Sequence, residues 1–357
     1  MNEVDYIIVG QGLAGTLLSY YLQKAGKTIH VFDNNHHLAA SSIAAGIINP
    51  ITGRFYVKSW RVDELIPFAT NLYKKIEKEL HIDFFHERNI LRALENPGAE
   101  NDWLAKTANE DYEAYLCPEV NLGHYKDKLK PMYAFGEVCQ SSQTNIPKLV
   151  QAFGEQLAAA NALTVAKFDY DALQIADDSV TYQSFKAKKI IFCEGHQCIN
   201  NPYFGFLPFR LSKGEVLEVH IPNAGFQKML KHHIFIVPLE EDRYWIGSFY
   251  DRDFESHKPT ELGRSSLLEQ LEQALDVPFE VLSHKAAIRP TVRDRRPFLG
   301  LHPKFTALAI FNGLGAKGAS LGPYFAEQMA NFLLKGQALD KEVDISKHLK
   351  KWYYPQA

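Results

Sequence analysis

The spacing of apolar and polar residues divides the chain into α/β stretches at both ends and a sheet-rich stretch between them. Residues 6–9 and residues 28–32 are short apolar runs, and each predicts a buried parallel strand. Between these runs, residues 16–25 place apolar side chains at helical spacing, and Gly26 ends the predicted helix. This order of strand, helix and strand is typical of a βαβ unit.

The rest of the chain continues this alternation and then interrupts it. The pattern predicts helices at 62–80, 145–160, 260–275 and 319–335, and strands at 84–94 (one or two), 163–165, 172–175, 180–182, 189–193 and 305–311. Residues 215–221, 234–238 and 244–249 alternate between apolar and polar side chains, which predicts antiparallel strands. We therefore expect an α/β fold (α+β overall): a Rossmann-like domain with a parallel sheet, and an inserted domain built on a mainly antiparallel sheet.

Composition excludes several classes of protein. The chain has 357 residues, of which 46% are hydrophobic and 23% charged, so wholesale disorder and a small disulfide scaffold are excluded. A net charge of −3 excludes a polycation that coats nucleic acid in bulk. The four cysteines, Cys117, Cys139, Cys193 and Cys198, are expected to be reduced thiols in a cytoplasmic protein. No apolar run approaches the ~18 residues that a membrane span needs, so no membrane association is expected.

A glycine-rich motif directly follows the first predicted strand. Gly10, Gly12 and Gly15 have the G-x-G-x-x-G spacing, and Asp33 ends the second strand. In a dinucleotide-binding turn the glycines allow a tight turn, close approach of a pyrophosphate and close helix packing, while the acid binds a ribose. Leu13 and Ala14 in the same turn are then cofactor contacts. The alternative is a turn that serves packing alone.

The first motif does not distinguish NAD from FAD, but the C-terminal part of the chain carries a second glycine-rich turn. Gly313, Gly315 and Gly318 lie between a predicted strand and a predicted helix, with Lys317 among them. One pyrophosphate does not need two such turns. A second helix N-terminus, with Lys317 beside it, could instead stabilise negative charge on a reduced flavin. The alternative is a plain helix start.

Residues 287–300 carry the most specific pattern. The order Arg289, Pro290, Asp294, Pro297 and Gly300 resembles the R-P-x-x-x-D-x-x-P-x-x-G motif of the FAD-dependent D-amino-acid oxidase superfamily. This superfamily includes glycine oxidase, sarcosine oxidases and the oxidase half of a tRNA wobble-uridine modification enzyme. Four further stretches resemble the family in the expected order: 41–46, 213–215, the pair Pro238 and 247–248, and 313–323.

The resemblance implies FAD as the cofactor and assigns residues to it. Ala287 stands where some sarcosine oxidases have the cysteine that binds flavin covalently, so the FAD is expected to be non-covalent. The expected cofactor contacts are Gly10, Gly12, Leu13, Ala14, Gly15, Asp33, Ser41, Ser42, Ala45, Gly46, Val165, Gly195, Gly313, Gly315, Lys317 and Gly318. The FAD-binding domain is predicted to comprise 1–80, 141–205 and 284–357, and the substrate-binding domain 81–140 and 206–283.

Three basic residues are candidates for the active site. In amino-acid-oxidising relatives an arginine at the position of Arg289 binds the substrate carboxylate, and a planar guanidinium suits that task. The alternative is an internal ion pair. Lys317 is expected near the flavin, and Arg54 either lines the active site or belongs to a surface turn. Arg293, Arg295 and Arg296 are expected to form a solvated or interdomain charge cluster.

The resemblance implies oxidation of the C–N bond of a small amine or amino acid, by hydride transfer to flavin N5. Residues 315–318 and 247–251 look closer to the tRNA-modifying oxidase than to glycine oxidase. The alternative function is therefore a stand-alone oxidase that removes a carboxymethyl group from a wobble-uridine side chain of tRNA. A non-catalytic flavoprotein that binds a partner is an alternative of another class.

Two clusters are expected to be unrelated to function. Cys193, His196 and Cys198 lie close together in the sequence, but they lack C-x-x-C spacing and a fourth ligand, so no metal site is predicted. The pairs 36–37 and 232–233 are adjacent histidines, which are expected at the surface.

Overall fold

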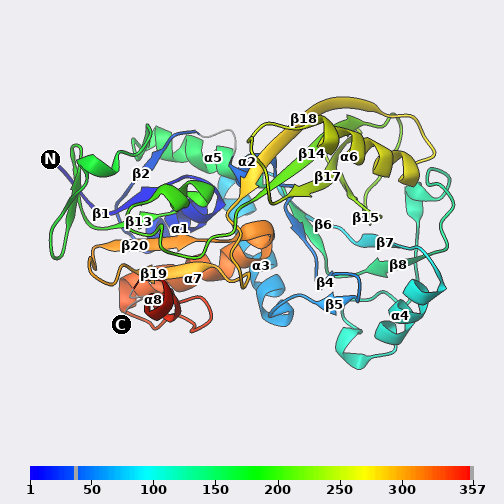
Figure 1. Ribbon diagram of the computed structural model, residues 1–357, viewed down its shortest axis with the longest axis horizontal. Helices are drawn as coiled ribbons and strands as arrows, with labels where there is room; N and C mark the ends of the chain where they lie inside the picture. Colours follow the sequence, from blue (N-terminus) through cyan, green and yellow to red (C-terminus); the bar gives the residue numbers. More distant parts are fainter. Residues whose placement is uncertain (36–38, 354–357) are drawn as a thin grey trace.

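The computed structural model describes residues 1–35 and 39–353, and the polypeptide forms two halves that are each built on a large sheet. Figure 1 shows the two halves side by side, with both chain ends on the half that contains β1 and β20. Strand β18 extends between the halves at the top of the molecule.

The first half contains a mixed sheet of eight described strands with a parallel centre. The strand order is β10-β2-β1-β13-β12-β11, and β20 joins β13 and carries β19. The bounds are β1 Asn2–Val9, β2 Ile29–Asp33, β10 Leu163–Val165, β11 Gln174–Ile175, β12 Val180–Tyr182, β13 Phe185–Phe192, β19 Phe298–Leu301 and β20 Leu308–Asn312. Strands β10, β2, β1, β13 and β20 run parallel. Each pair of parallel strands is joined by a crossover connection, which for β1 and β2 is helix α1, and the apolar runs of β1, β2, β13 and β20 are buried.

Four helices cover this sheet and the space beside it. They are α1 Leu13–Lys24, α3 Val62–Leu80, α5 Ile146–Ala159 and α7 Gly318–Lys335. Helix α1 is buried along most of its length, because it lies between the sheet and α7. Helix α3 buries one stripe, including Leu65, Ala69 and Ile76, and leaves its charged face in solvent.

The second half contains a sheet of seven described strands that is antiparallel except for one pair. Its order is β18-β14-β17-β16-β15-β7-β8, with bounds β7 Ile90–Leu94, β8 Ala134–Val138, β14 Ser212–His220, β15 Met229–Lys231, β16 Phe235–Pro238, β17 Arg243–Asp251 and β18 Glu280–Arg289. Helix α6 (Glu261–Ala274) covers one face, where Leu217, Ile246 and Leu271 form a core. The other face turns towards the first half.

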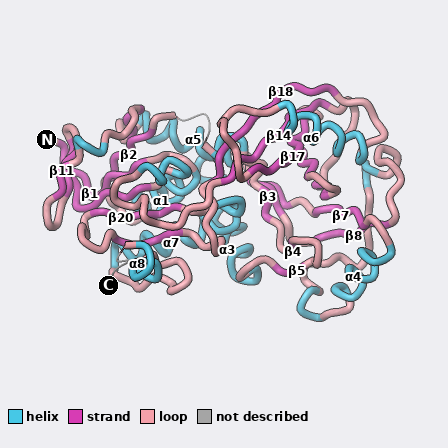
Figure 2. Tube along the Cα trace, in the orientation of Figure 1, coloured by secondary structure: helices cyan, strands magenta, loops and turns pink. Residues whose placement is uncertain are grey.

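Short elements complete the two halves and the region between them, and Figure 2 shows the loops around them. They are α2 Ala40–Ile43, β3 Ile47–Ile48, β4 Ile51–Thr52, β5 Val57–Lys58, β6 Phe85–Glu87, α4 Pro97–Thr107, β9 Ser142–Thr144 and α8 Ser346–Trp352. Strands β3, β9 and β6 form a small sheet, and β4 and β5 form a hairpin. Because β3 directly follows α2, this small sheet fixes the segment at 41–46 beside the first glycine-rich turn.

The predicted fold class is confirmed, and the structure corrects several details. The expected helices are present within two or three residues, whereas β18, which carries Arg289, was not predicted. Cys117 and Cys139 form a disulfide, so the expectation of four reduced thiols is wrong for this pair; Cys193 and Cys198 are buried free thiols. The spacing of the first two cysteines did not indicate that β8 brings them together. His233 is exposed as expected, but His232 is buried, and the pair at 36–37 lies outside the described residues.

Candidate active site

A cavity of about 1830 Å³ lies where the two halves meet. Its walls come from the carboxyl ends of β1, β2 and β13, the N-termini of α1 and α7, the segment at 39–47, and one face of the second sheet. In an open α/β sheet, ligands bind outside the carboxyl ends of the strands, so the cavity has the expected place for a cofactor site.

Close packing requires glycine at two positions of the first glycine-rich turn. Gly10 has a φ of +101°, and a Cβ on it would lie 2.5 Å from the carbonyl oxygen of Cys193. A Cβ on Gly15 would lie 1.9 Å from the carbonyl oxygen of Gly10. Gly15 therefore lets α1 approach the turn, as predicted, and it does not itself line the cavity.

The N-terminus of α1 opens into this cavity without a side-chain cap. Gly12 is the N-cap residue, no acidic side chain occupies the first turn, and the Leu13 N–H donates to Ser41 Oγ at 3.0 Å. Several N–H groups of a helix's first turn lack a partner inside the helix. Here those groups and the positive end of the helix dipole are available to an anion.

Asp33 ends β2 at the cavity wall and also holds the glycine-rich turn. Its Oδ2 accepts a hydrogen bond from the Gln11 N–H at 2.7 Å, and its Oδ1 accepts one from the Asn35 N–H at 2.7 Å. A carboxylate has further lone pairs that can accept hydrogen bonds from a hydroxyl. Asp33 thus links the turn to the place predicted for the ribose.

A second uncapped helix N-terminus lines the same cavity. Helix α7 begins after Lys317, with no side-chain cap and no acid in its first turn. Lys317 Nζ donates to Ser59 Oγ at 3.0 Å, and Ser59 Oγ donates to the carbonyl oxygen of Asn49 at 2.9 Å. Burial lowers the pKa of Lys317, and the nearby positive charges of Arg295 and Arg296 lower it further. This ammonium group therefore lies in a positive, partly dry region that suits an anion.

Two helix N-termini without side-chain caps and a carboxylate at the end of β2 line one large cavity, which fits a long dinucleotide, and the family comparison agrees. A family model described as DAO, FAD dependent oxidoreductase, matches residues 5–332. The chain belongs to this family of FAD-dependent oxidoreductases. It is an enzyme, and its cofactor is FAD.

Relatives match this oxidoreductase along nearly its whole length. Glycine oxidase of Bacillus licheniformis is 24% identical over 93% of this chain and 94% of its own. The bifunctional tRNA 5-methylaminomethyl-2-thiouridine biosynthesis protein MnmC of Idiomarina loihiensis is 21% identical over 91% of this chain, which spans 55% of that protein. The crystal structure of glycine oxidase from Geobacillus kaustophilus covers 97% of this chain with a TM-score of 0.80 at 20% identity, which shows a shared fold.

Most residues predicted to contact the cofactor line the cavity of the oxidoreductase. They are Gly10, Gly12, Leu13, Ala14, Asp33, Ser41, Ser42, Ala45, Gly46, Val165, Gly195, Gly315, Lys317 and Gly318. Gly15 and Gly313 lie behind the wall, where Gly313 packs beside Val292. Arg54 also lies outside the wall: it is exposed at the tip of the β4–β5 hairpin, and its guanidinium stacks on Phe55. When bound, FAD would supply a two-electron acceptor that the side chains of the protein lack.

Arg289 reaches the cavity from the end of β18. Its Nη2 donates to Ser248 Oγ at 2.8 Å, and its guanidinium lies 5.9 Å from the centre of the Tyr250 ring. Burial lowers the pKa of Arg289, and no carboxylate of the described residues lies within 4 Å of it. The alternative of an internal ion pair is therefore absent from the described part of the chain. A buried guanidinium without a counterion is costly unless an anion binds it.

The Lys213-Gly214-Glu215 segment lies within strand β14 and is not a turn, and the geometry explains its residues. A Cβ on Gly214 would lie 2.5 Å from Arg289 Nη2, so the glycine leaves the space that the guanidinium occupies. On the opposite face of β14, Lys213 and Glu215 form a buried ion pair at 3.0 Å. Glu215 also accepts hydrogen bonds from the backbone and the hydroxyl of Thr260, which begins α6. One short segment therefore supports Arg289 on one face and anchors a helix on the other.

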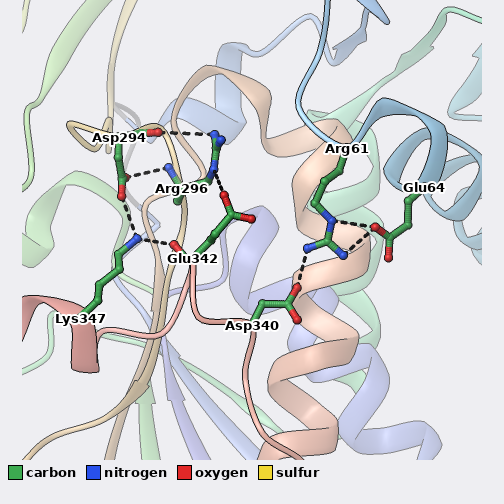
Figure 3. Close-up of polar contacts among 7 residues, drawn as sticks. All are labelled: Arg61, Glu64, Asp294, Arg296, Asp340, Glu342 and Lys347. Carbon is green, nitrogen blue, oxygen red and sulfur yellow. Dashed lines mark hydrogen bonds and ion pairs between the residues drawn. The ribbon is translucent and has the colours of Figure 1, made fainter. Parts of the chain in front are cut away.

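The segment after Arg289 is fixed by the C-terminal part of the chain, as Figure 3 shows. Asp294 pairs with Lys347 of α8 at 2.7 Å, and Arg296 pairs with Glu342 at 3.4 Å. Arg296 also stacks on Trp60 at 3.7 Å from the ring centre. Arg296 thus belongs to a charge cluster between segments, as expected, and the cluster leaves Arg289 as the cation that enters the cavity from this motif.

Sequence reasoning gave no role to Ser248 and Glu194, which line the cavity, or to Ser59, which accepts a hydrogen bond from Lys317. The family resemblance covers Ser248 but does not assign its hydroxyl, and 258 residues separate Ser59 from Lys317. Glu194 follows β13, where burial raises the pKa of its carboxyl to about 7. Its oxygens accept hydrogen bonds from Tyr170 and, at 2.8 Å, from Asn201. The only signal for Glu194 in the sequence is the place of its carboxylate directly after a predicted buried strand.

In the described part of the chain, no group of three or more His, Cys, Asp or Glu residues is arranged to hold a metal ion. No described helix combines the length and the apolar composition that crossing a bilayer requires.

Proposed function

We propose that this oxidoreductase oxidises the C–N bond of a small amine or amino acid that carries a carboxylate beside the reacting carbon. The observation that carries the proposal is Arg289: a buried guanidinium at the cavity wall, supported by Gly214 and Ser248, with no carboxylate partner among the described residues. A planar fork can bind a carboxylate through two parallel hydrogen bonds. Arg289 would hold the substrate in one orientation against the cofactor.

The similarity to glycine oxidases supports this choice, because those relatives are named for an amino acid. In the proposed reaction a hydride equivalent would pass from the carbon beside a neutral amine to the FAD that the cavity would hold, and the electron pair of nitrogen forms the C=N bond. The amine proton goes to solvent, and water hydrolyses the imine. The chain needs no dedicated base for this, since an unprotonated amine supplies its own electron pair.

The direct test is anaerobic mixing of the yellow holoenzyme with glycine, sarcosine, proline, D-amino acids and undermodified tRNA. Bleaching of the flavin absorbance by one of the amino acids is the expected result. Bleaching by none of these compounds would favour a non-catalytic flavoprotein that binds a partner.

Arg289→Ala tests whether Arg289 binds the substrate carboxylate. Leaving a desolvated carboxylate unpaired costs about 2–5 kcal/mol, which corresponds to a loss of roughly 30- to 5000-fold in kcat/KM. Arg289→Lys should recover part of the activity, because a point charge replaces the charge but not the fork. FAD content, measured on the same preparation, should not change. Loss of FAD together with activity would point to a structural role instead.

A tRNA substrate is the second candidate, and exposed cations beside the cavity favour it. The positive charge of Arg295 lowers the pKa of Lys317, which lines the cavity. Arg293, two residues before Arg295, is also exposed. The carboxymethylaminomethyl group of a wobble uridine is also a secondary amine with a carboxylate, so Arg289 would serve it too. Micromolar, salt-sensitive binding of tRNA, with bleaching by undermodified tRNA alone, would replace the small amine by this substrate.

A further inference from the structure

A second cationic site lies on the same face of the second sheet as the cavity. Lys231 on β15 is the direct neighbour of Phe235 on β16 and of Arg92 on β7. Directly opposed residues of neighbouring strands point to the same face of a sheet. Phe235 lines the cavity, and Lys231 and Arg92 lie beyond it on the same face of the sheet, on the next two strands. Lys231 Nζ lies 5.0 Å from the centre of the Phe235 ring.

The core residues of these strands confirm that the two cations face the first half. Ile90 and Met229, each two residues before a member of the pair, belong to the core shared with the first half. Leu91 and Leu230, which alternate with them, belong to the core under α6. Lys231 and Arg92 therefore lie between the sheet and the β4–β5 hairpin, where Tyr56 packs 5.4 Å from the Arg92 guanidinium.

Neither cation has a carboxylate partner. No acidic oxygen of the described residues lies within 4 Å of Lys231 or Arg92. The charged and titratable groups around the pair are the phenol of Tyr56, the imidazoles of His232 and His233, and the carboxylate of Glu95. Glu95 makes its ion pair with His233 instead, at 3.4 Å.

Lys231 Nζ donates a hydrogen bond to the carbonyl oxygen of His233, but burial and the positive charge of Arg92 still disfavour its charged form. Burial lowers the pKa of Lys231 to about 8, and Arg92 lowers it as well. Burial also lowers the pKa of Arg92, which the Tyr56 hydroxyl partly offsets. An oxyanion between the two side chains would remove both penalties, because each cation would gain a charge-assisted hydrogen bond.

We propose that Lys231 and Arg92 form a second oxyanion subsite, which binds a phosphate or carboxylate group at the far end of the substrate. The Arg289 guanidinium contacts Ser248 on β17, and two strand spacings separate β17 from β15, or roughly 10 Å at about 4.8 Å each. One extended amino-acid unit spans only about 3.5 Å. A free amino acid bound to Arg289 therefore leaves this subsite empty, and a substrate that uses both sites is several such units long. This inference rests on the proposed function only for identifying the ligand as part of the substrate.

Calorimetric titration of the holoenzyme at low ionic strength with inorganic phosphate and with glutarate tests the subsite. At least one of the two anions should bind, and Lys231→Met and Arg92→Met should each weaken that binding roughly tenfold or more. Lys148→Met is the matched control, because Lys148 is an exposed lysine already paired with Glu240, and it should leave the affinity unchanged. The anion with the higher affinity identifies the source as phosphate or carboxylate.

Proton uptake gives a second readout that folding defects do not imitate. The bound anion favours charged Lys231, so binding near pH 8 should take up a proton and the affinity should fall above that pH. Lys231→Met should abolish this uptake while retaining FAD and the melting temperature. Absence of binding by both anions, or equal binding by wild type and both variants, would overturn the proposal. Neither result depends on turnover, so a failure here is separate from a failure of the proposed reaction.

Discussion

At the scale of single residues, the site depends on two glycines, because a side chain at either position would fill space that the site needs. Gly214 has no side chain where the Arg289 guanidinium lies, and Gly12 has none where α1 meets the segment at 39–47. The sequence analysis included both glycines: Gly12 belongs to the G-x-G-x-x-G motif, and Gly214 belongs to a stretch that resembles the family. It could not show that Gly214 touches Arg289, since the two residues are distant in the sequence and meet only through the pairing of β14 with β18.

Gly214→Ala should displace Arg289 without removing its charge. The added Cβ would lie 2.5 Å from Arg289 Nη2, so the guanidinium must move away from Ser248. We expect kcat/KM for a carboxylate-bearing amine to fall about tenfold or more, mainly through KM, with FAD content preserved. Steady-state kinetics beside Gly98→Ala, at a glycine of α4 that does not line the cavity, would check this. Equal kinetic effects of both substitutions would contradict a positioning role for Gly214.

Gly12→Val should abolish flavin binding. Gly12 is the N-cap residue of α1, and a Cβ there already lies 3.2 Å from Ser41 Oγ before the branched methyl groups are added. The added groups fill the space that a pyrophosphate needs at this helix end. The variant should purify colourless, with unchanged far-ultraviolet circular dichroism. A yellow Gly12→Val protein would show that the pyrophosphate does not bind at this helix end.

At the scale of elements, the N-termini of α1 and α7 share one cavity, although their glycine-rich turns lie at opposite ends of the chain. Sequence patterns predicted both helices and both turns, because these signals are local: an apolar strand, glycines and helical spacing. The patterns missed β18, β8 and the hairpin of β4 and β5. The reason is that these strands are short or carry polar residues such as His284 and Lys285, which only the partner strands make extended.

Lys317→Met should lower the reduction potential of the bound flavin. Lys317 stands at the start of α7 and is held by Ser59, so its positive charge adds to that of the helix end. Removing the charge destabilises the anionic reduced state more than the neutral oxidised state. Equilibration with reference dyes should give a more negative potential than for wild type, and Lys335→Met at the other end of α7 serves as the control. An unchanged potential would mean that the charge of Lys317 does not act on the flavin ring.

Asp5 joins the first strands of the parallel sheet in a pH-dependent way. A hydrogen bond from Lys188 is the main cause that lowers the pKa of Asp5 from 3.8 to about 2, and Thr28 adds two more hydrogen bonds. Because the folded-state pKa is depressed, the stabilisation is present above about pH 4 and is lost as the pH falls towards 2. Asp5→Asn should lower the free energy of unfolding by about 1 kcal/mol at pH 7.

Urea unfolding of wild type and Asp5→Asn at pH 7 and at successively lower pH would measure this difference, with Asp178→Asn in an exposed turn as the control. The difference should shrink below pH 4. A difference that stays constant down to pH 2 would mean that ionised Asp5 does not cause it.

At the scale of the whole molecule, the cavity lies between two sheets that each have their own core. FAD binds the folded arrangement and not the unfolded chain, so it stabilises the protein by mass action, by about 2.7 kcal/mol at a hundredfold excess over Kd. Apoprotein prepared by acid treatment should melt at a lower temperature than holoprotein, and added FAD should restore the melting temperature. The predicted absence of a covalent bond is checked in the same experiment. Flavin that stays with the precipitated protein would contradict it.

The charge cluster in Figure 3 sets the order of events when the protein is made. Lys347 and Glu342 hold the segment that follows Arg289, and α7 supplies one end of the cofactor cavity. A nascent chain that has already exposed its first glycine-rich turn still lacks both of these supports until residues 318–347 have left the ribosome. We therefore expect stable flavin binding only after this segment has been made. A ribosome stalled within the first three hundred residues should carry a chain that cannot retain the cofactor.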